Sequence, residues 1–147
     1  MIVPNGTVVM VLDGAKMALY RNVGEAFAPE LELLDSVEEE IPSSAELGSD
    51  RPGRHFESMG TSRGAYEAPD YHQEEEARFA REAAGRLNLL AADEHVRLIL
   101  IADPRILGLV RPQLDEATVE RLAAQIDRNY AGRSARDVGE LLAGYEA

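Results

Sequence analysis

Residues 7–14, "TVVMVLDG", decide the centre of the fold. The first six are apolar or β-branched and carry no charge, which is typical of a strand buried on both faces of a sheet. The Asp13-Gly14 pair that follows is a strong hairpin signal, so residues 17–22 are predicted to return as a second strand. Residues 31–37 predict a third strand. The chain therefore begins as an antiparallel meander.

The second half of the chain alternates helices and strands. Residues 70–92 have apolar side chains at steps of three and four, which predicts a helix. Residues 96–102, "VRLILIA", predict another buried strand, and Asp103-Pro104 opens a short helix because proline is favoured at the first helical position. Residues 135–145 predict a closing helix. This order favours an α/β sheet with at least one parallel pair.

Residues 115–130 are ambiguous. Their Glu, Arg, Leu, Ala and Gln content favours a helix by local propensity. Leu122, Ala124 and Ile126, however, alternate with polar or small residues, as they would in a strand.

Composition narrows the class of protein. The chain has 147 residues, the usual length of one domain, and a formal net charge of −12, which argues against general nucleic-acid binding. The absence of cysteine excludes disulfides and thiolate metal sites. Residues 7–12 are too short an apolar run for a signal peptide or a membrane span. We therefore expect a cytoplasmic protein without membrane contact.

One segment departs from this acidic character. Residues 48–65, "GSDRPGRHFESMGTSRGA", contain three arginines, a histidine and four glycines with almost no aliphatic side chains. Such a composition cannot bury enough apolar surface to fold alone, so residues 41–69 are predicted to form a long loop.

Four stretches carry a resemblance: "NGTVVMVLDGAKMALYRN", "ELGSDRPGRHFES", "HQEEEARFAREAAGRLN" and "LILIADPRILGLVRPQL". Together they resemble the bacterial family of host-attachment proteins, which in turn is similar to the middle domain of archaeal and eukaryotic peptide-chain release factors. The resemblance implies a single α/β domain over residues 1–147, with a mixed sheet of about five strands flanked by helices. It implies a meander followed by α-β-α-β-α, with residues 119–128 as a strand parallel to 96–102.

The resemblance also suggests an activity. Release factors carry Gly-Gly-Gln in the loop between the third strand and the first long helix, where it positions water against the peptidyl-tRNA ester. The matching loop, residues 41–69, lacks this motif. Its nearest equivalents are Met59-Gly60-Thr61 and Gln73, so Gln73 is the candidate catalytic residue. Its structural alternative is a capping box with Asp70. The sequence leaves open whether the protein is an enzyme.

A second group of candidates could bind RNA or another phosphate. Arginine suits bidentate phosphate contacts, and glycine lets the backbone approach a ligand closely. The alternative is that Asp50 pairs with one of these arginines and pins the loop to the sheet. The candidates are Arg51, Arg54, His55, Gly60 and Arg63.

Two other patterns have simpler explanations. Residues 60–64 match G-x-S-x-G, but a hydrolase elbow needs a strand directly before it and a helix directly after it. Asp13 and Asp103, with Glu74 or Glu75, could hold Mg²⁺. The alternative is that Asp13 closes a turn and Asp103 caps a helix. No metal and no cofactor are expected.

The sequence therefore favours a release-factor-like protein that acts on ribosome-associated tRNA, in a role such as ribosome rescue, with residues 48–64 as its working surface. The alternative is a non-catalytic interaction module with a protein partner, involved in attachment to host cells. The oligomeric state is left open.

Overall fold

Strand β1 lies in the middle of a five-stranded sheet in the computed structural model, which describes residues 1–39 and 58–146, with the backbone alone over 58–72. The strand order is β3-β2-β1-β4-β5. The strands are β1 (Val8–Leu12), β2 (Lys16–Asn22), β3 (Leu31–Glu38), β4 (Leu98–Ala102) and β5 (Leu122–Asp127). The helical elements are α2 (Ser58–Leu90), α3 (Pro104–Val110), the 3₁₀ turn η2 (Arg111–Gln113), α4 (Glu116–Arg121) and α5 (Ala135–Gly144).

The sheet is mixed, as predicted. β1, β2 and β3 form an antiparallel meander, whereas β4 runs parallel to β1 and β5 runs parallel to β4. Every residue of β1 and of β4 is buried, which explains why both strands have continuous apolar sequences instead of an alternation. The β2–β3 ladder shifts register beside Leu19 and Tyr20. The predicted α/β class is confirmed.

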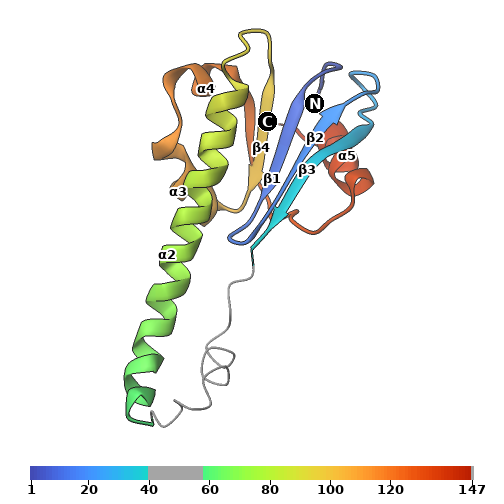
Figure 1. Ribbon diagram of the computed structural model, residues 1–147. Helices are drawn as coiled ribbons and strands as arrows, with labels where there is room; N and C mark the ends of the chain where they lie inside the picture. Colours follow the sequence, from blue (N-terminus) through green and yellow to red (C-terminus); the bar gives the residue numbers. More distant parts are fainter. Residues whose placement is uncertain (40–57, 147) are drawn as a thin grey trace.

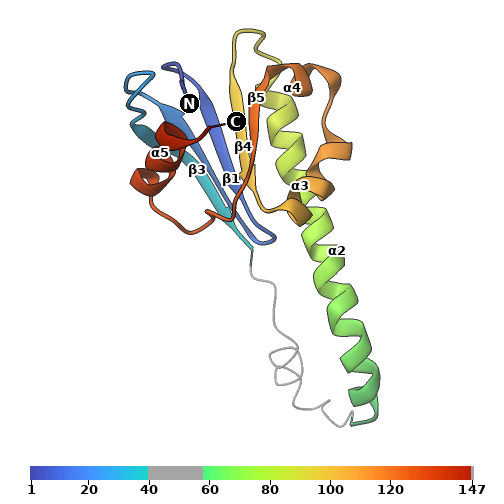
Figure 2. The ribbon, with the colours of Figure 1, turned by 180° about the vertical axis from the view of Figure 1, so that it is seen from behind.

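Helices cover both faces of the sheet (Figure 1 and Figure 2). α2 and α3 pack on one face and α5 packs on the other. On the first face, α2 contributes small side chains and two large ones, which allows the helix to lie close to β1 and β4; these are Phe79, Ala80, Ala83, Ala84 and Leu87. On the second face, Val138 and Leu142 of α5 pack with Ile99, Ile101 and Ile126.

Helix α2 begins earlier than the sequence predicted. It starts at Ser58, so the predicted loop of residues 41–69 is wrong over 58–69, which are helical. Asp70 therefore lies inside the helix and does not cap it, and the predicted capping box with Gln73 is wrong as well. Pro69 removes one backbone hydrogen bond, but the Ala and Glu residues around it favour helix.

Among the described residues, no helix combines the length and apolar character needed to cross a membrane.

The ambiguous segment contains both a helix and a strand. Residues 116–121 form α4, so the strand predicted over 119–128 is wrong for residues 119–121 and 128, whereas residues 122–127 form β5 parallel to β4 as predicted. Ile126 is fully buried opposite Ile101. Tertiary packing of this side chain overrides the helical propensity of its neighbours.

Asn88 of α2 holds the crossover between β4 and β5 in place. Its side-chain oxygen accepts hydrogen bonds from the Asp115 backbone N–H at 2.9 Å and from the Thr118 hydroxyl at 2.6 Å. Its side-chain nitrogen donates to the Gln113 carbonyl at 3.1 Å. Thr118 is fully buried, so its hydroxyl requires this partner.

The packing of α2 on the sheet predicts the outcome of a paired substitution. Leu87 is 0% exposed in the core, whereas Leu89 of the same helix is 78% exposed. Leu87→Ala should lower the free energy of unfolding by about 2–5 kcal/mol because it leaves a cavity. Leu89→Ala should change it by less than about 0.5 kcal/mol. Urea denaturation of both variants tests this, and equal losses would contradict the packing described.

Candidate functional site

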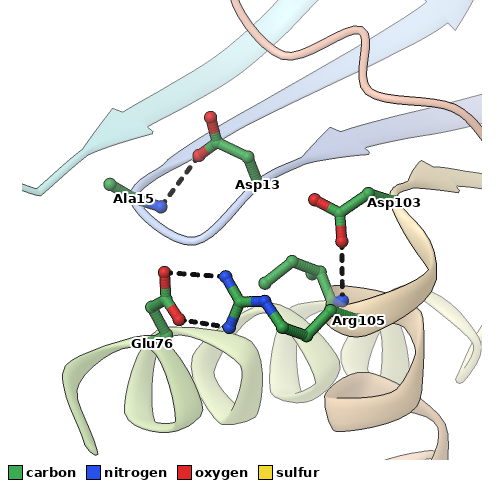
Figure 3. A network of polar contacts seen from close by, with 6 residues as sticks. Asp13, Ala15, Glu76, Asp103 and Arg105 are labelled. Carbon is green, nitrogen blue, oxygen red and sulfur yellow. Dashed lines mark hydrogen bonds and ion pairs between the residues drawn. The ribbon is translucent and has the colours of Figure 1, made fainter. Parts of the chain in front are cut away.

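The carboxyl ends of β1 and β4 place two aspartates at one edge of the sheet (Figure 3). Asp13 follows β1, and its Oδ1 accepts hydrogen bonds from the backbone N–H groups of Ala15 at 2.8 Å and Lys16 at 2.6 Å. Asp103 follows β4, and its Oδ1 accepts from the Ile106 N–H at 2.9 Å. Asp13 thus closes the hairpin turn and Asp103 caps α3, which confirms the structural alternative for both.

An ion pair between two helices lies beside these aspartates. Arg105 of α3 forms a two-pronged contact with Glu76 of α2, in which the Arg105 Nη2 donates to the Glu76 Oε2 at 3.0 Å and its Nη1 donates to the Oε1. The hydrogen bond with Glu76 raises the pKa of Arg105. The pair joins α2 to the start of α3 at the edge where the parallel strands end (Figure 3).

Gly14 of the hairpin turn leaves room for the Glu76 carboxylate. A Cβ at Gly14 would lie 2.6 Å from the Glu76 Oε2 and 2.9 Å from its Cγ, closer than real contacts allow. The backbone φ of Gly14 is not in the left-handed region, so the position needs glycine for space and not for conformation. The hairpin, α2 and α3 therefore meet around one carboxylate.

A second ion-pair group connects α2 to the end of β3. Arg78 contacts Glu75 one turn earlier on the helix and lies 3.9 Å from the carboxylate of Glu39. The hydrogen bond with Glu75 raises the pKa of Arg78. The Glu39 backbone N–H also donates to the Ala15 carbonyl at 2.7 Å. These contacts fix the point where the chain leaves β3.

The polar edge, defined as Asp13, Glu76, Arg78, Asp103 and Arg105, lacks the features of a metal centre. Within residues 1–39 and 73–146, no three His, Asp or Glu side chains are grouped so that they could hold a metal ion. The polar edge contains charges of both signs. Glu76 pairs with Arg105 and does not form an acidic group with Asp13 and Asp103. Sequence analysis did not identify Glu76 or Arg105, because no short motif relates two residues 29 positions apart. The arrangement anchors α2 to the sheet.

The predicted site residues are spread along and before α2. The side chain of Gln73 is exposed, and it follows Ser58 by 15 residues, or about 22 Å of helix. Gly60 and Arg63 fall in the first two turns of α2. Ser62 of the G-x-S-x-G pattern is also helical and does not follow a strand, so the pattern is not a nucleophile elbow. Arg51, Arg54 and His55 lie outside the described residues.

A hollow of about 480 Å³ lies at the opposite end of the sheet, where β1 and β4 begin. Its lining includes the positively charged side chains of Arg97 and Arg121 and the negatively charged side chains of Glu94 and Glu120. Arg121 donates to the backbone carbonyls of Asp93 and Ala117. The hollow is thus separate from the polar edge and from the start of α2.

The fold defines a release-factor-like α/β domain. Its meander, the long helix after the third strand and the two further parallel strands follow the order that the resemblance implied. Residues 6–142 match the model of the family described as bacterial archaeo-eukaryotic release factor family 12, and the chain belongs to this family. No curated protein matches the chain.

The close approach of Gly14 and Glu76 predicts a coupled pair of substitutions. Gly14→Ala should displace the Glu76 side chain, break its contact with Arg105 and lower the free energy of unfolding by about 1 kcal/mol, since the pair is partly exposed. In a Glu76→Ala background the same change should cost much less, because the obstructing carboxylate is gone. Chemical denaturation of the double-mutant cycle measures the coupling, and additive effects would contradict it.

Proposed function

We propose that this protein binds ribosome-associated tRNA through residues 48–64 and acts there as a release-factor-like protein, in ribosome rescue. The observation that carries the proposal is the match to a release-factor family over residues 6–142. A fold alone does not specify an activity, so the proposal also depends on the chemistry of the segment.

The charge of residues 48–64 supports contact with RNA. The segment has three arginines against Asp50 and Glu57, whereas the whole chain carries a net charge of −12. Arginine forms bidentate contacts with phosphate, and the remaining acidic surface repels it. Binding would therefore be local and would orient the protein with this segment toward the RNA.

The shape of the molecule is consistent with this orientation. α2 extends well past the edge of the sheet, so its first residues, 58–64, lie far from the acidic body (Figure 1). The contacts of Glu76 and Arg78 hold the helix where it leaves the sheet. A helix that is anchored at one end and projects at the other can reach into a narrow ribosomal space.

The reaction implied by the family is hydrolysis of the peptidyl-tRNA ester. Water would attack the ester carbonyl, the bond to the ribose oxygen would break, and the proton would pass to that oxygen. Gln73 is the candidate that would orient the water, since the chain has no Gly-Gly-Gln. The absence of that motif favours, as the second candidate, an interaction module that binds without hydrolysis and has a protein partner, including one on a host cell.

Replacement of Arg51 and Arg54 tests the binding surface. Arg51→Ala with Arg54→Ala should abolish co-sedimentation with ribosomes and flatten the dependence of tRNA affinity on salt by roughly one unit of slope per lost phosphate contact. The matched control is Arg21→Ala with Arg81→Ala, which removes the same charge from two exposed positions of β2 and α2.

Thermal stability distinguishes the two roles of these arginines. A binding role predicts an unchanged melting temperature. If they instead pair with Asp50, the double variant should melt earlier, because a carboxylate loses its partner. Wild-type protein without salt-sensitive binding to ribosomes or tRNA would refute the proposed function and leave the interaction module.

The role of Gln73 has its own test. If Gln73 orients the attacking water, Gln73→Ala should reduce release of a labelled peptide from ribosome-bound peptidyl-tRNA by about 10²-fold or more, with unchanged ribosome association. Glu74→Ala is the control, because Glu74 is the next residue of α2 and is also exposed. Equal release by the wild type and Gln73→Ala would remove Gln73 from the mechanism.

A further inference from the structure

A second basic segment lies in the described part of the chain. Residues 128–136, "RNYAGRSAR", connect β5 to the first turn of α5 and contain three arginines and no acidic residue. Arg128, Arg133 and Arg136 are all exposed. Arg136 pairs with Glu140 one turn later on α5, whereas Arg128 and Arg133 form no ion pair with any described residue.

The guanidinium of Arg133 lies over an aromatic ring. Its guanidinium carbon lies 4.7 Å from the centre of the Tyr130 ring. Tyr130 is partly buried against the core between the sheet and α5, so the ring is a fixed support. A hydrogen bond from the backbone N–H of Arg133 to the backbone carbonyl of Tyr130, at 3.0 Å, closes the turn. This cation–π contact restrains the guanidinium while the side chain stays exposed to solvent.

Lys16, the only lysine of the chain, lies beside this turn. Its Nζ is 3.8 Å from the position that a Cβ would occupy at Gly132, whose φ of +88° is in the left-handed region that favours glycine. The hairpin between β1 and β2 thus adds a third positive charge. The neighbouring carboxylate of Asp13 is bonded to the turn amides, including the Lys16 N–H.

Two hydrogen bonds to backbone carbonyls hold Arg128 in place. Its backbone N–H donates to the Ala102 carbonyl at the end of β4 at 3.1 Å, and its side-chain Nη1 donates to the Asp127 carbonyl at 2.8 Å. The loop lies at the end of the sheet where β1 turns into β2, which is also where β3 ends (Figure 1 and Figure 2). Lys16, Arg128, Tyr130 and Arg133 form what we term the β5–α5 basic surface.

We infer that the β5–α5 basic surface is a second RNA contact, which takes the backbone phosphates of an unpaired RNA segment and stacks one base on the Arg133 guanidinium. The inference rests on the proposed function and extends it from one surface to two. RNA fits better than an acidic protein because the surface offers a planar stacking group beside two further cations. An unpaired base can stack on the face of the guanidinium, whereas a carboxylate binds its N–H edge and leaves that face unused.

The experiment compares two double variants in one tRNA-binding titration. Arg128→Ala with Arg133→Ala should weaken binding by roughly tenfold or more at 0.1 M salt and reduce the salt slope by about 1.4, since each of the two lost phosphate contacts on unpaired RNA contributes about 0.7. Arg21→Ala with Arg81→Ala is again the control with matched charge. Circular dichroism should show unchanged melting, because Arg128 and Arg133 are exposed.

A conservative substitution separates stacking from charge. Arg133→Lys keeps the charge but loses the planar group. The variant should therefore have the salt slope of the wild type and an affinity several-fold below it. Full recovery of the affinity by Arg133→Lys would overturn the stacking assignment. Poly-glutamate that competes as well as tRNA at equal charge would overturn the RNA assignment in favour of an acidic protein partner.

The two double variants test the two proposed RNA contacts separately. If Arg51→Ala with Arg54→Ala abolishes binding and Arg128→Ala with Arg133→Ala matches the control, the second contact is refuted and the proposed function stands. If the reverse holds, the second contact stands and residues 48–64 lose their assigned role.

Discussion

The parallel pairing of β1 with β4 is the constraint on which the other elements depend. All five residues of each strand are buried, so both faces of the pair must be covered. α2 and α3 supply one cover and α5 the other. A parallel pair also requires a crossover, and here it contains the whole segment from β2 to α2. The candidate RNA-binding segment is therefore part of the crossover that joins the central pair.

The carboxyl edge of the sheet links that topology to function. Parallel strands end together, so turns and helix starts with polar side chains gather at one edge. In this protein those polar groups are engaged within the fold: Asp13 and Asp103 accept hydrogen bonds from backbone amides, and Glu76 forms an ion pair with Arg105. The edge serves as a rigid base for the projecting part of α2. Of residues 48–64, which are proposed to contact RNA, the described residues 58–64 lie beyond this base, and the β5–α5 basic surface lies beside it.

Sequence patterns could predict the elements whose signals are local. The apolar runs of β1 and β4, the Asp13-Gly14 turn and the Asp103-Pro104 helix start were all visible, because each depends on neighbouring residues. β5 was harder, since only the burial of Ile126 between the sheet and α5 outweighs a helical composition. The start of α2 was misplaced because Pro69 and the nearby glycines resemble a boundary. Glu76 and Arg105 could not be paired from sequence, as their contact exists only after α2 docks on the sheet. Gln73 was proposed by analogy alone.

The register shift in the β2–β3 ladder bears on the behaviour of the protein at high concentration. β3 is an edge strand, and a long regular edge offers backbone groups to which a strand of another molecule can add. The shift beside Leu19 and Tyr20 interrupts that regularity, and Glu32 and Glu38 bring negative charge along the same strand. Two such edges would meet with mismatched backbones and like charges. The strand is thus built to stay unpaired on its outer side and to discourage sheet-to-sheet aggregation in a crowded cell.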